Sequence, residues 1–283
     1  MLKIIAFLLM PFAAILAEGA GRKLKARFEN RRGPPISQPF RDLAKLWGKK
    51  SSGKDNDAFF KAAPMLYFIA TLAMFAIIPA SLIAFNYDFI FLIYVTILAN
   101  AFYILAGVSS DSPFAIVGSL REMSLMVCYE ATLAMSVFSF VIYNGVVSFA
   151  SFNAPFAILT LPLASIALIT AALAESKTRP FDTAEADTEI NASMETEYSG
   201  RDLFFMQLAK YLKKFFYVLF VPFLLIGTTD IFAYAAGCAA MIFLISFLQA
   251  TSPRYRADQA FKYLLVIAAL AAFDLVRAIG GLV

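Results

Sequence analysis

Long apolar runs separated by short polar segments dominate this chain and predict its elements. Eight runs stand out, at residues 4–17, 63–85, 89–108, 114–143, 155–174, 212–227, 231–250 and 263–282. A transmembrane helix needs about 20 predominantly apolar residues, whereas the strands of a membrane barrel alternate apolar and polar positions. The pattern therefore predicts an all-α integral membrane protein with about eight transmembrane helices, in a single polytopic membrane domain over residues 1–283.

The composition excludes a water-soluble domain. Hydrophobic residues make up 61% of the 283 positions and charged residues 16%, whereas soluble proteins carry roughly 45–50% apolar and about 25% charged residues. The first apolar run passes directly into Arg22 and Lys23 without a small-residue cleavage site, which indicates a retained helix and not a removed signal peptide. No internal repeat is visible, which argues against an inverted-repeat transporter.

The basic residues gather in alternate segments between the predicted helices. The segments 19–61, 109–122, 175–214 and 251–262 hold 22 of the 24 lysines and arginines. With eight helices these four segments lie on one face of the membrane. Because cytoplasmic loops are enriched in Lys and Arg, we expect this face to be cytoplasmic and both termini to lie outside the cell membrane.

The scarcity of metal-ligating side chains limits the redox chemistry of the chain. There is no histidine, and the two cysteines, Cys128 and Cys238, lie in separate apolar runs. Iron–sulfur clusters are usually held by four cysteines, and histidine dominates haem, zinc and copper sites. We therefore expect no cofactor or metal to be bound by this chain.

One of the basic segments also contains an acidic stretch. Between Glu175 and Asp202 there are eight carboxylates and three basic residues. Glu185 and Glu189 are four residues apart and would share one face of a helix. Carboxylates so close raise one another's pKa, as does burial, which favours a proton relay. The alternative is that this acidic stretch is a solvent-exposed loop without a role in proton transfer.

Two carboxylates fall inside apolar runs. Glu130 lies mid-run, where a charge costs at least ~2.5 kcal/mol in a bilayer, so it should face the bundle interior or water and have a functional role. Asp274 lies three residues before Arg277 and can form a local ion pair.

The first basic segment combines charge with a fixed backbone path. Gly33-Pro34-Pro35 restricts the chain, and Asp42 and Lys45 can pair on one helical face. Attraction to anionic headgroups is the simpler interpretation of the charge alone.

These segments together resemble the H-type subunit of respiratory complex I and of the energy-converting membrane hydrogenases. The matching strings include Glu18, Arg27 to Pro34, Asp42 to Leu46, Arg121 to Glu130, Ala174-Glu175, Arg179 to Asp182, Glu185 to Glu189, Glu197 to Gly200, and Pro253 to Arg256 followed by Asp258-Gln259. They stand in family order along nearly the whole chain.

The resemblance implies an eight-helix membrane anchor between a peripheral redox arm and an ion-translocating membrane arm. The charge relay that it implies comprises Asp42, Glu130, Glu175, Glu185, Glu189 and Glu197. The loop facing the redox arm or a quinone comprises Arg27, Arg179, Phe181 and Asp182.

The sequence departs from the family in two places. Gly33 to Pro39 is short, as in the hydrogenase and sulfur-reductase branch. Lys210 stands where relatives place a glutamate early in the sixth helix, which would interrupt the carboxylate relay.

The resemblance implies a coupling subunit of an ion-translocating oxidoreductase, most simply a membrane-bound hydrogenase or sulfane sulfur reductase without quinone. A quinone-reducing complex I is the alternative in the same class, and a stand-alone secondary ion transporter is the alternative in another. The implied partners are peripheral iron–sulfur and large hydrogenase-like subunits, small membrane subunits, antiporter-like subunits and lipid, with no nucleic acid. Iron–sulfur clusters, and a nickel–iron centre or flavin, would lie on the partners.

The topology can be tested by cysteine labelling in intact cells. Because the basic face is predicted to be cytoplasmic, a cysteine placed in the 144–154 loop should react with an impermeant thiol reagent. A cysteine that replaces Ser51 should not react. The reverse labelling pattern would overturn the orientation.

Overall fold

The computed structural model describes residues 2–51, 58–78, 87–152, 157–185, 193–227 and 230–281, and its regular elements there are helices. The α-helices are α1 (Leu2–Phe28), α2 (Gln38–Gly48), α3 (Ala58–Ile77), α4 (Asp88–Val108), α5 (Pro113–Asn144), α6 (Ala157–Thr160), α7 (Pro162–Glu175), α9 (Gly200–Ile226), α10 (Ile231–Thr251) and α11 (Ala257–Ile279). Two short 3₁₀ turns are η1 (Phe149–Ser151) and η2 (Ser193–Thr196). The all-helical prediction is confirmed.

The described part of each predicted apolar run coincides with helical structure, and α4, α5 and α10 match their runs to within one residue at each end. The run 155–174 is broken into α6 and α7 at Leu161, whose backbone lies outside the helical region at φ −122° and ψ 69°. Pro162 follows directly, and a proline disfavours the helical conformation of the residue before it.

The predicted ends of the first and sixth apolar helices are wrong. Helix α1 continues through Arg22 and Lys25 to Phe28, and α9 begins at Gly200 and not at 212. Much of the expected loops 19–61 and 175–214 is therefore helical. Lysine and arginine are good helix formers, so charge marks the end of an apolar run and not the end of a helix.

Five of the described helices are long and apolar enough to cross a membrane, namely α1, α3, α4, α5 and α10. Helix α7 is apolar but shorter, with 14 residues. Helices α9 and α11 have 27 and 23 residues and carry more charge. The chain is a multi-pass membrane protein, and the number of eight spans stays a prediction.

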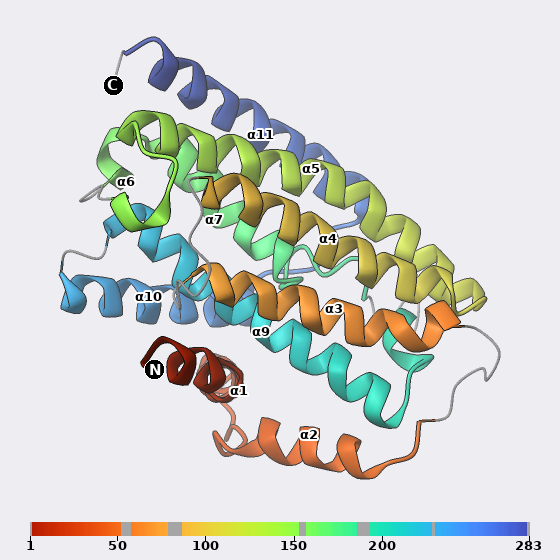
Figure 1. Ribbon diagram of the computed structural model, residues 1–283. Coiled ribbons are helices and arrows are strands. Elements are labelled where there is room, and N and C mark those ends of the chain that lie inside the picture. The colour runs from red at the N-terminus through yellow and green to blue at the C-terminus, as the bar shows by residue number, and fades with distance from the viewer. Residues whose placement is uncertain are drawn as a thin grey trace.

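The long helices form a bundle in which α9 occupies a central position. Figure 1 shows α11, α5, α4, α3 and α9 running side by side, with α11 at one edge and α2 at the other. Helix α11 packs on α5 and α7, α3 packs on α4 and α9, and α1 packs on α9 and α10. Helices α1, α3, α7 and α10 all contact α9. The side chains of α9 therefore meet groups from several parts of the sequence.

The turn η2 is held against the bundle by small residues and one aromatic stack. Tyr198 stacks on Phe60 with ring centroids 4.2 Å apart, and its hydroxyl donates to the carbonyl of Ala106 at 2.9 Å. Gly107 and Gly118 leave room for the side chains of η2. This packing fixes the acidic segment around η2 at one end of α4, α5 and α9.

A larger residue at Gly118 should loosen η2. A Cβ there would collide with Ser193 Oγ and lie 3.0 Å from the carbonyl oxygen of Ala184. Overpacking of this kind costs about 1–3 kcal/mol. Gly118→Ala should therefore lower the thermal unfolding temperature in detergent. Gly48→Ala is the control, because a Cβ at Gly48 meets nothing within 4 Å, and equal stability of the two variants would contradict the described packing.

Candidate functional site

Three lysines on one side of α9 organise the buried charges of the protein. Lys210, Lys213 and Lys214 are spaced as i, i+3 and i+4, so they lie on neighbouring positions of one helical face. Each ammonium group contacts carboxylates from a different element: Glu185 and Glu195 for Lys210, Glu175 for Lys213, and Glu18 for Lys214. Helix α9 thereby carries cations into a largely apolar bundle.

The innermost pair joins α9 to α7. Lys213 Nζ lies 2.5 Å from Glu175 Oε2, and both residues are 1% exposed. Lys213 Nζ also donates to Asn100 Oδ1 on α4. A buried charge needs a partner to offset its desolvation, and this arrangement supplies two acceptors to one ammonium group.

Asn100 links this pair to Glu130 on α5. Its Nδ2 group donates to Glu130 Oε1 at 2.6 Å and to Glu175 Oε2 at 3.0 Å. Asn100 has two N–H donors and one carbonyl oxygen, and these contacts use both sides of the amide. The orientation of the amide is thus fixed by the ammonium group on one side and the two carboxylates on the other.

The inner cluster, defined as Glu130, Glu175, Lys213 and Asn100, holds two carboxylates against one ammonium group. Glu130 is 7% exposed, and among the described residues its hydrogen-bond donors are the neutral groups of Asn100 and Thr96, the latter at 3.4 Å. An unpaired charge in such a place is very costly. One proton on the carboxylate pair would remove this excess negative charge.

A second group of charges lies nearer the end of the bundle. Lys210 Nζ lies 2.5 Å from Glu185 Oε1, and the hydroxyl of Tyr103 donates to the same oxygen at 2.5 Å. Burial opposes the ionisation of Glu185, but the ammonium groups of Lys210 and Lys177 outweigh it and lower the pKa of Glu185 to about 2. The sequence-based expectation of a raised pKa therefore does not hold at Glu185, where Lys210 and Lys177 outweigh burial, whereas Asp182 in the same acidic stretch does have a raised pKa.

Lys177 and Glu122 complete this outer cluster, which we define as Glu185, Glu195, Lys210, Tyr103, Lys177 and Glu122. Lys177 Nζ lies 3.4 Å from Glu122 Oε1 and 2.7 Å from the centroid of the Tyr103 ring. Burial lowers the pKa of Lys177 to about 8, against the attraction of Glu122 and Glu185. Lys177 can therefore exchange a proton close to physiological pH.

Two helices and one tyrosine connect the outer and inner clusters. Tyr103 and Asn100 are three residues apart on α4, as are Lys210 and Lys213 on α9, which corresponds to a rise of about 4.5 Å. On α5, the hydroxyl of Tyr129 donates to Glu122 at 2.8 Å, and Glu130 is the next residue. The two clusters are thus about one helical turn apart.

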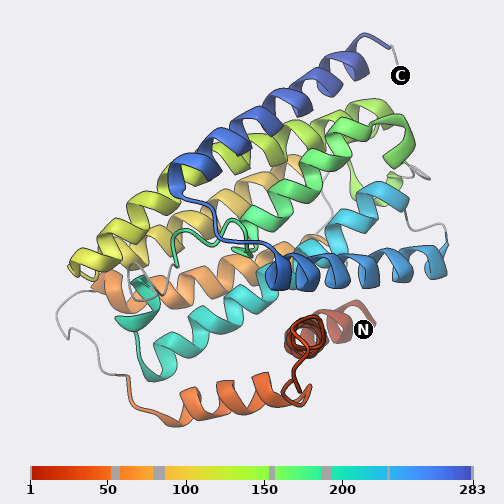
Figure 2. The ribbon, with the colours of Figure 1, turned by 180° about the vertical axis from the view of Figure 1, so that it is seen from behind.

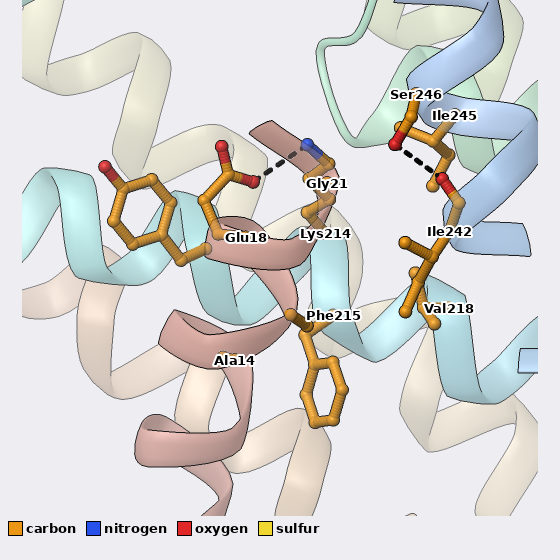
Figure 3. A pocket seen from close by; sticks show the side chains of 11 residues that line it. Ala14, Glu18, Gly21, Lys214, Phe215, Val218, Ile242, Ile245 and Ser246 are labelled. Atoms are coloured by element: carbon orange, nitrogen blue, oxygen red, sulfur yellow. Dashed lines mark hydrogen bonds and ion pairs between the residues drawn. The ribbon is translucent and has the colours of Figure 1, made fainter. Parts of the chain in front are cut away.

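The third lysine faces α1 and the surface. Lys214 Nζ lies 2.8 Å from Glu18 Oε2, and Figure 3 shows this pair beside Gly21 and Phe215. Glu18 also accepts from Arg22, which in turn lies 3.1 Å from Asp42 Oδ2 on α2. The row of charges therefore continues from the inner part of α9 to Asp42 at the surface.

The cavity beside Glu18 is small. It has a volume of about 20 Å³ and lies between α1, α9 and α10, with Ser246 on its far side (Figure 3). A water molecule needs at least about 10–15 Å³ measured in this way. The cavity therefore has room for one water molecule and not for an aromatic ring.

The predicted redox-arm loop lies beside the outer cluster, since Asp182 is within electrostatic range of Glu185. Asp182 Oδ2 is 2.7 Å from Arg254 Nη2, and Phe181 is buried against Tyr255 and Tyr263. Burial raises the pKa of Asp182 to about 6, and repulsion from Glu185 acts in the same direction.

The arginines predicted for this loop are at the surface. Arg27 is exposed in the last turn of α1, and Arg179 is exposed after α7. Neither guanidinium group enters the outer cluster.

The structure brings together some of the predicted relay residues and separates others. Glu130 and Glu175 meet through Asn100, and Glu185 lies in the outer cluster, one helical turn away. The prediction that Glu130 faces the bundle interior is confirmed. Glu197 is only partly buried after η2. Glu189, and the helix expected to place it beside Glu185, lie outside the described residues.

Asp274 forms the local ion pair with Arg277 that the sequence suggests. It is fully buried, pairs with Arg277 at 2.8 Å, and accepts from the backbone N–H of Ala164 at 2.9 Å. In the described ranges no group of three or more Asp, Glu, Cys or His side chains could hold a metal ion.

Sequence reasoning misses the cations and the amide of the site. Lys213, Lys177, Asn100 and Glu122 fall in predicted loops or apolar helices, where the sequence gives them no evident role. The spacing of three lysines as i, i+3 and i+4 before an apolar run is the available signal. An i, i+3, i+4 pattern of one charge indicates a helical face that needs carboxylate partners.

Loss of the innermost ammonium group should strongly destabilise the protein. Lys213→Met leaves Glu175 buried without a counter-charge, which costs about 3–5 kcal/mol. The free energy of unfolding in mixed detergent micelles measures this loss. Lys45→Met, at an exposed position of α2, is the control and should change it by less than about 0.5 kcal/mol.

A double variant separates loss of the pair from loss of packing. Adding Glu175→Gln to Lys213→Met removes the stranded charge and should restore much of the stability. If Lys213→Met alone were as stable as Lys45→Met, the pair would not exist in the folded protein.

Comparisons with known proteins agree with this architecture. The family described as NADH dehydrogenase matches residues 2–278. The H-type subunit of the NADH-quinone oxidoreductase of Dehalococcoides mccartyi (strain CBDB1) is 29% identical over 265 residues, covering 86% of this chain and 74% of the relative. Hydrogenase-4 component C of Escherichia coli (strain K12) is 32% identical over 223 residues, covering 74% and 71%.

A solved structure has the same fold. A chain in the membrane-bound sulfane sulfur reductase, an archaeal respiratory membrane complex, superposes with a TM-score of 0.86 at 24% identity. The match covers 96% of this chain and 98% of that chain. Since the family match spans nearly every residue and the fold agrees over the same length, this chain belongs to the NADH dehydrogenase family of membrane subunits.

Proposed function

We propose that this chain is the membrane coupling subunit of a complex-I-like, ion-translocating oxidoreductase. The observation that supports this most strongly is the row of buried charges on α9, which runs from the acidic segment around η2 to Glu130 in the middle of α5. Buried ionisable residues in a membrane segment usually mark ion or proton pathways. The redox centres would belong to partner subunits.

The names of the relatives suggest the setting. They include subunits of NADH-quinone oxidoreductase and hydrogenase-4, and the structural neighbour belongs to a sulfane sulfur reductase. The short segment from Gly33 to Pro39, as in the hydrogenase and sulfur-reductase branch, favours a hydrogenase or sulfane reductase type of complex. A quinone-reducing complex is the alternative in the same class.

The geometry suggests how charge would move. Electron arrival on the peripheral arm would place negative charge near the outer cluster, where Lys177 has a pKa of about 8. That negative charge would alter the field at Lys210 and, one helical turn away, at Lys213. Because charges interact strongly in a medium of low dielectric constant, the shared proton of Glu130 and Glu175 would then move onward.

In this proposal Lys210 does not interrupt the relay. Its ammonium group is held by Glu185 and Glu195 and keeps Glu185 ionised. The outer cluster thus works by changes in charge balance, and the inner cluster works by proton exchange. The basic face would be cytoplasmic, with both termini outside the cell membrane, and peripheral and antiporter-like subunits would bind on either side.

Glu130→Gln should uncouple ion movement from electron transfer. The amide keeps the hydrogen bonds of Asn100 possible but cannot exchange a proton, so assembly should persist while ions moved per electron fall at least several-fold. The ratio is measured in vesicles that contain the purified complex. Glu29→Gln, an exposed carboxylate paired with Arg31, is the control and should keep the parent ratio.

Two results would contradict the proposal. A normal ratio in the Glu130→Gln variant would make Glu130 a structural residue. Ion-dependent transport by the purified single chain, without redox partners, would instead identify a secondary transporter.

A further inference from the structure

The end of α1 and the segment that follows it form a basic hollow on the surface. The hollow has a volume of about 650 Å³, within the usual range of small-ligand sites. It is lined by Lys23, Arg27, Asn30, Arg31, Arg32 and Gly33. Figure 2 shows α1 at one side of the bundle, between α10 and α2, so the hollow lies at the edge of the protein.

The backbone gives this hollow a fixed shape, because the chain turns back onto α1. The N–H group of Arg31 donates to the carbonyl oxygen of Ala26 at 2.9 Å, and Asn30 adopts the left-handed conformation with φ 53°. Gly33 then packs on the helix, since a Cβ there would lie 2.8 Å from Ala26 Cβ and 3.3 Å from Lys23 Cα. The cations of the turn are thereby held beside the cations of the last helical turns.

The hollow carries an excess of positive charge. Glu29 pairs with Arg31 at 2.5 Å, which balances one of its four cations. Among the described residues no carboxylate forms an ion pair with Lys23, Arg27 or Arg32. Three cationic groups therefore remain for an anionic ligand. Two of them are guanidinium groups, which bind phosphate oxygens in pairs.

An exposed apolar stripe on α1 leads to this hollow. The stripe comprises four side chains that are 50–57% exposed, namely Ile5, Leu9, Phe12 and Leu16. Lys23 and Arg27 follow Leu16 by seven and eleven residues, and these spacings keep all six positions on one helical face. The same face of α1 is thus apolar along most of its length and cationic at its end.

The length of α1 places the cations at the surface of the membrane. Ile5 and Lys23 are 18 residues apart, which corresponds to about 27 Å along a helix. The hydrocarbon core of a bilayer is about 30 Å thick, and only 22% of the most apolar stretch of α1 is buried in the protein. With the stripe in contact with acyl chains, Lys23 and Arg27 therefore lie at the level of the phosphate groups.

We propose that this hollow binds the phosphate group of an anionic phospholipid whose acyl chains lie along the apolar stripe of α1. Lys23 and Arg27 donate to the phosphate oxygens from the helix, and Arg32 donates from the turn. An acidic soluble protein would match the cations but not the stripe, whereas an anionic phospholipid matches both. The site does not depend on the coupling function proposed above, because it shares no residue with the inner or outer cluster.

Native mass spectrometry of the delipidated, detergent-purified protein, with the subunits that co-purify, tests the site. Phosphatidylglycerol and phosphatidylcholine with identical acyl chains are titrated separately, and phosphatidylglycerol should bind more tightly. Lys23→Gln and Arg32→Gln each remove one charge from an exposed position. Each should weaken the tightest phosphatidylglycerol binding about fivefold, the effect of one basic residue near an anionic surface, and the double variant about 25-fold.

The control is Arg41→Gln, which removes the same charge from an exposed position of α2 outside the hollow and should leave the binding unchanged. Thermal unfolding without lipid checks that each variant folds.

Four results would overturn the proposal. Equal affinity for the two lipids would show that the cations do not select the headgroup. An equal loss of affinity in Arg41→Gln and Lys23→Gln would indicate general attraction to a basic surface. Displacement of the lipid by glycerol phosphate at the same concentration would assign the site to a free anion. Binding that begins only when the soluble subunits are removed would assign the hollow to a protein partner.

Discussion

The structure depends on one ammonium group placed where water cannot reach it. Lys213 lies between Glu175 and Asn100, and Asn100 connects both to Glu130. Charges are costly to bury unless they are paired and hydrogen-bonded, so α4, α5, α7 and α9 must meet at this point. Lys213 balances the charge of Glu175, which leaves Glu130 without a counter-charge. A proton bound to Glu130 would neutralise it.

Helix α9 also places two further lysines close to Lys213. Helix α9 presents Lys210 one turn before Lys213, and Lys214 on the adjacent position toward α1. The outer cluster is closed by η2, whose packing on α4 and α5 depends on two glycines and on the stack of Tyr198 with Phe60. Stability and the proposed coupling would thus rest on the same contacts, because a shift of η2 would move Glu195 away from Lys210.

The apolar helices could be predicted from the sequence, because a run of about 20 apolar residues is stable in a membrane only as a helix. The bounds of α4, α5 and α10 agree with the predicted runs. Glu130 could be predicted to face inward, since a charge in the middle of an apolar run has no other stable position. Lys213 could not be predicted from hydropathy, which counts every lysine as a surface residue. Its burial depends on Glu175 and Asn100, which lie 38 and 113 positions away in the sequence. Arg179 is expected near the reactive loop, yet its side chain is exposed, because the tight turn after α7 directs Phe181 inward instead.

The central claim of the proposed coupling function is that Glu130, which unlike Glu175 has no ammonium partner among the described residues, carries a proton in the resting protein. Infrared spectroscopy of the purified protein in lipid detects the carbonyl stretch of a protonated carboxylic acid, which is absent from ionised carboxylates. The account predicts such a band at neutral pH, with a frequency typical of a buried acid, and its loss in the Glu130→Gln variant. A spectrum without that band, or a band that Glu130→Gln leaves unchanged, would contradict it.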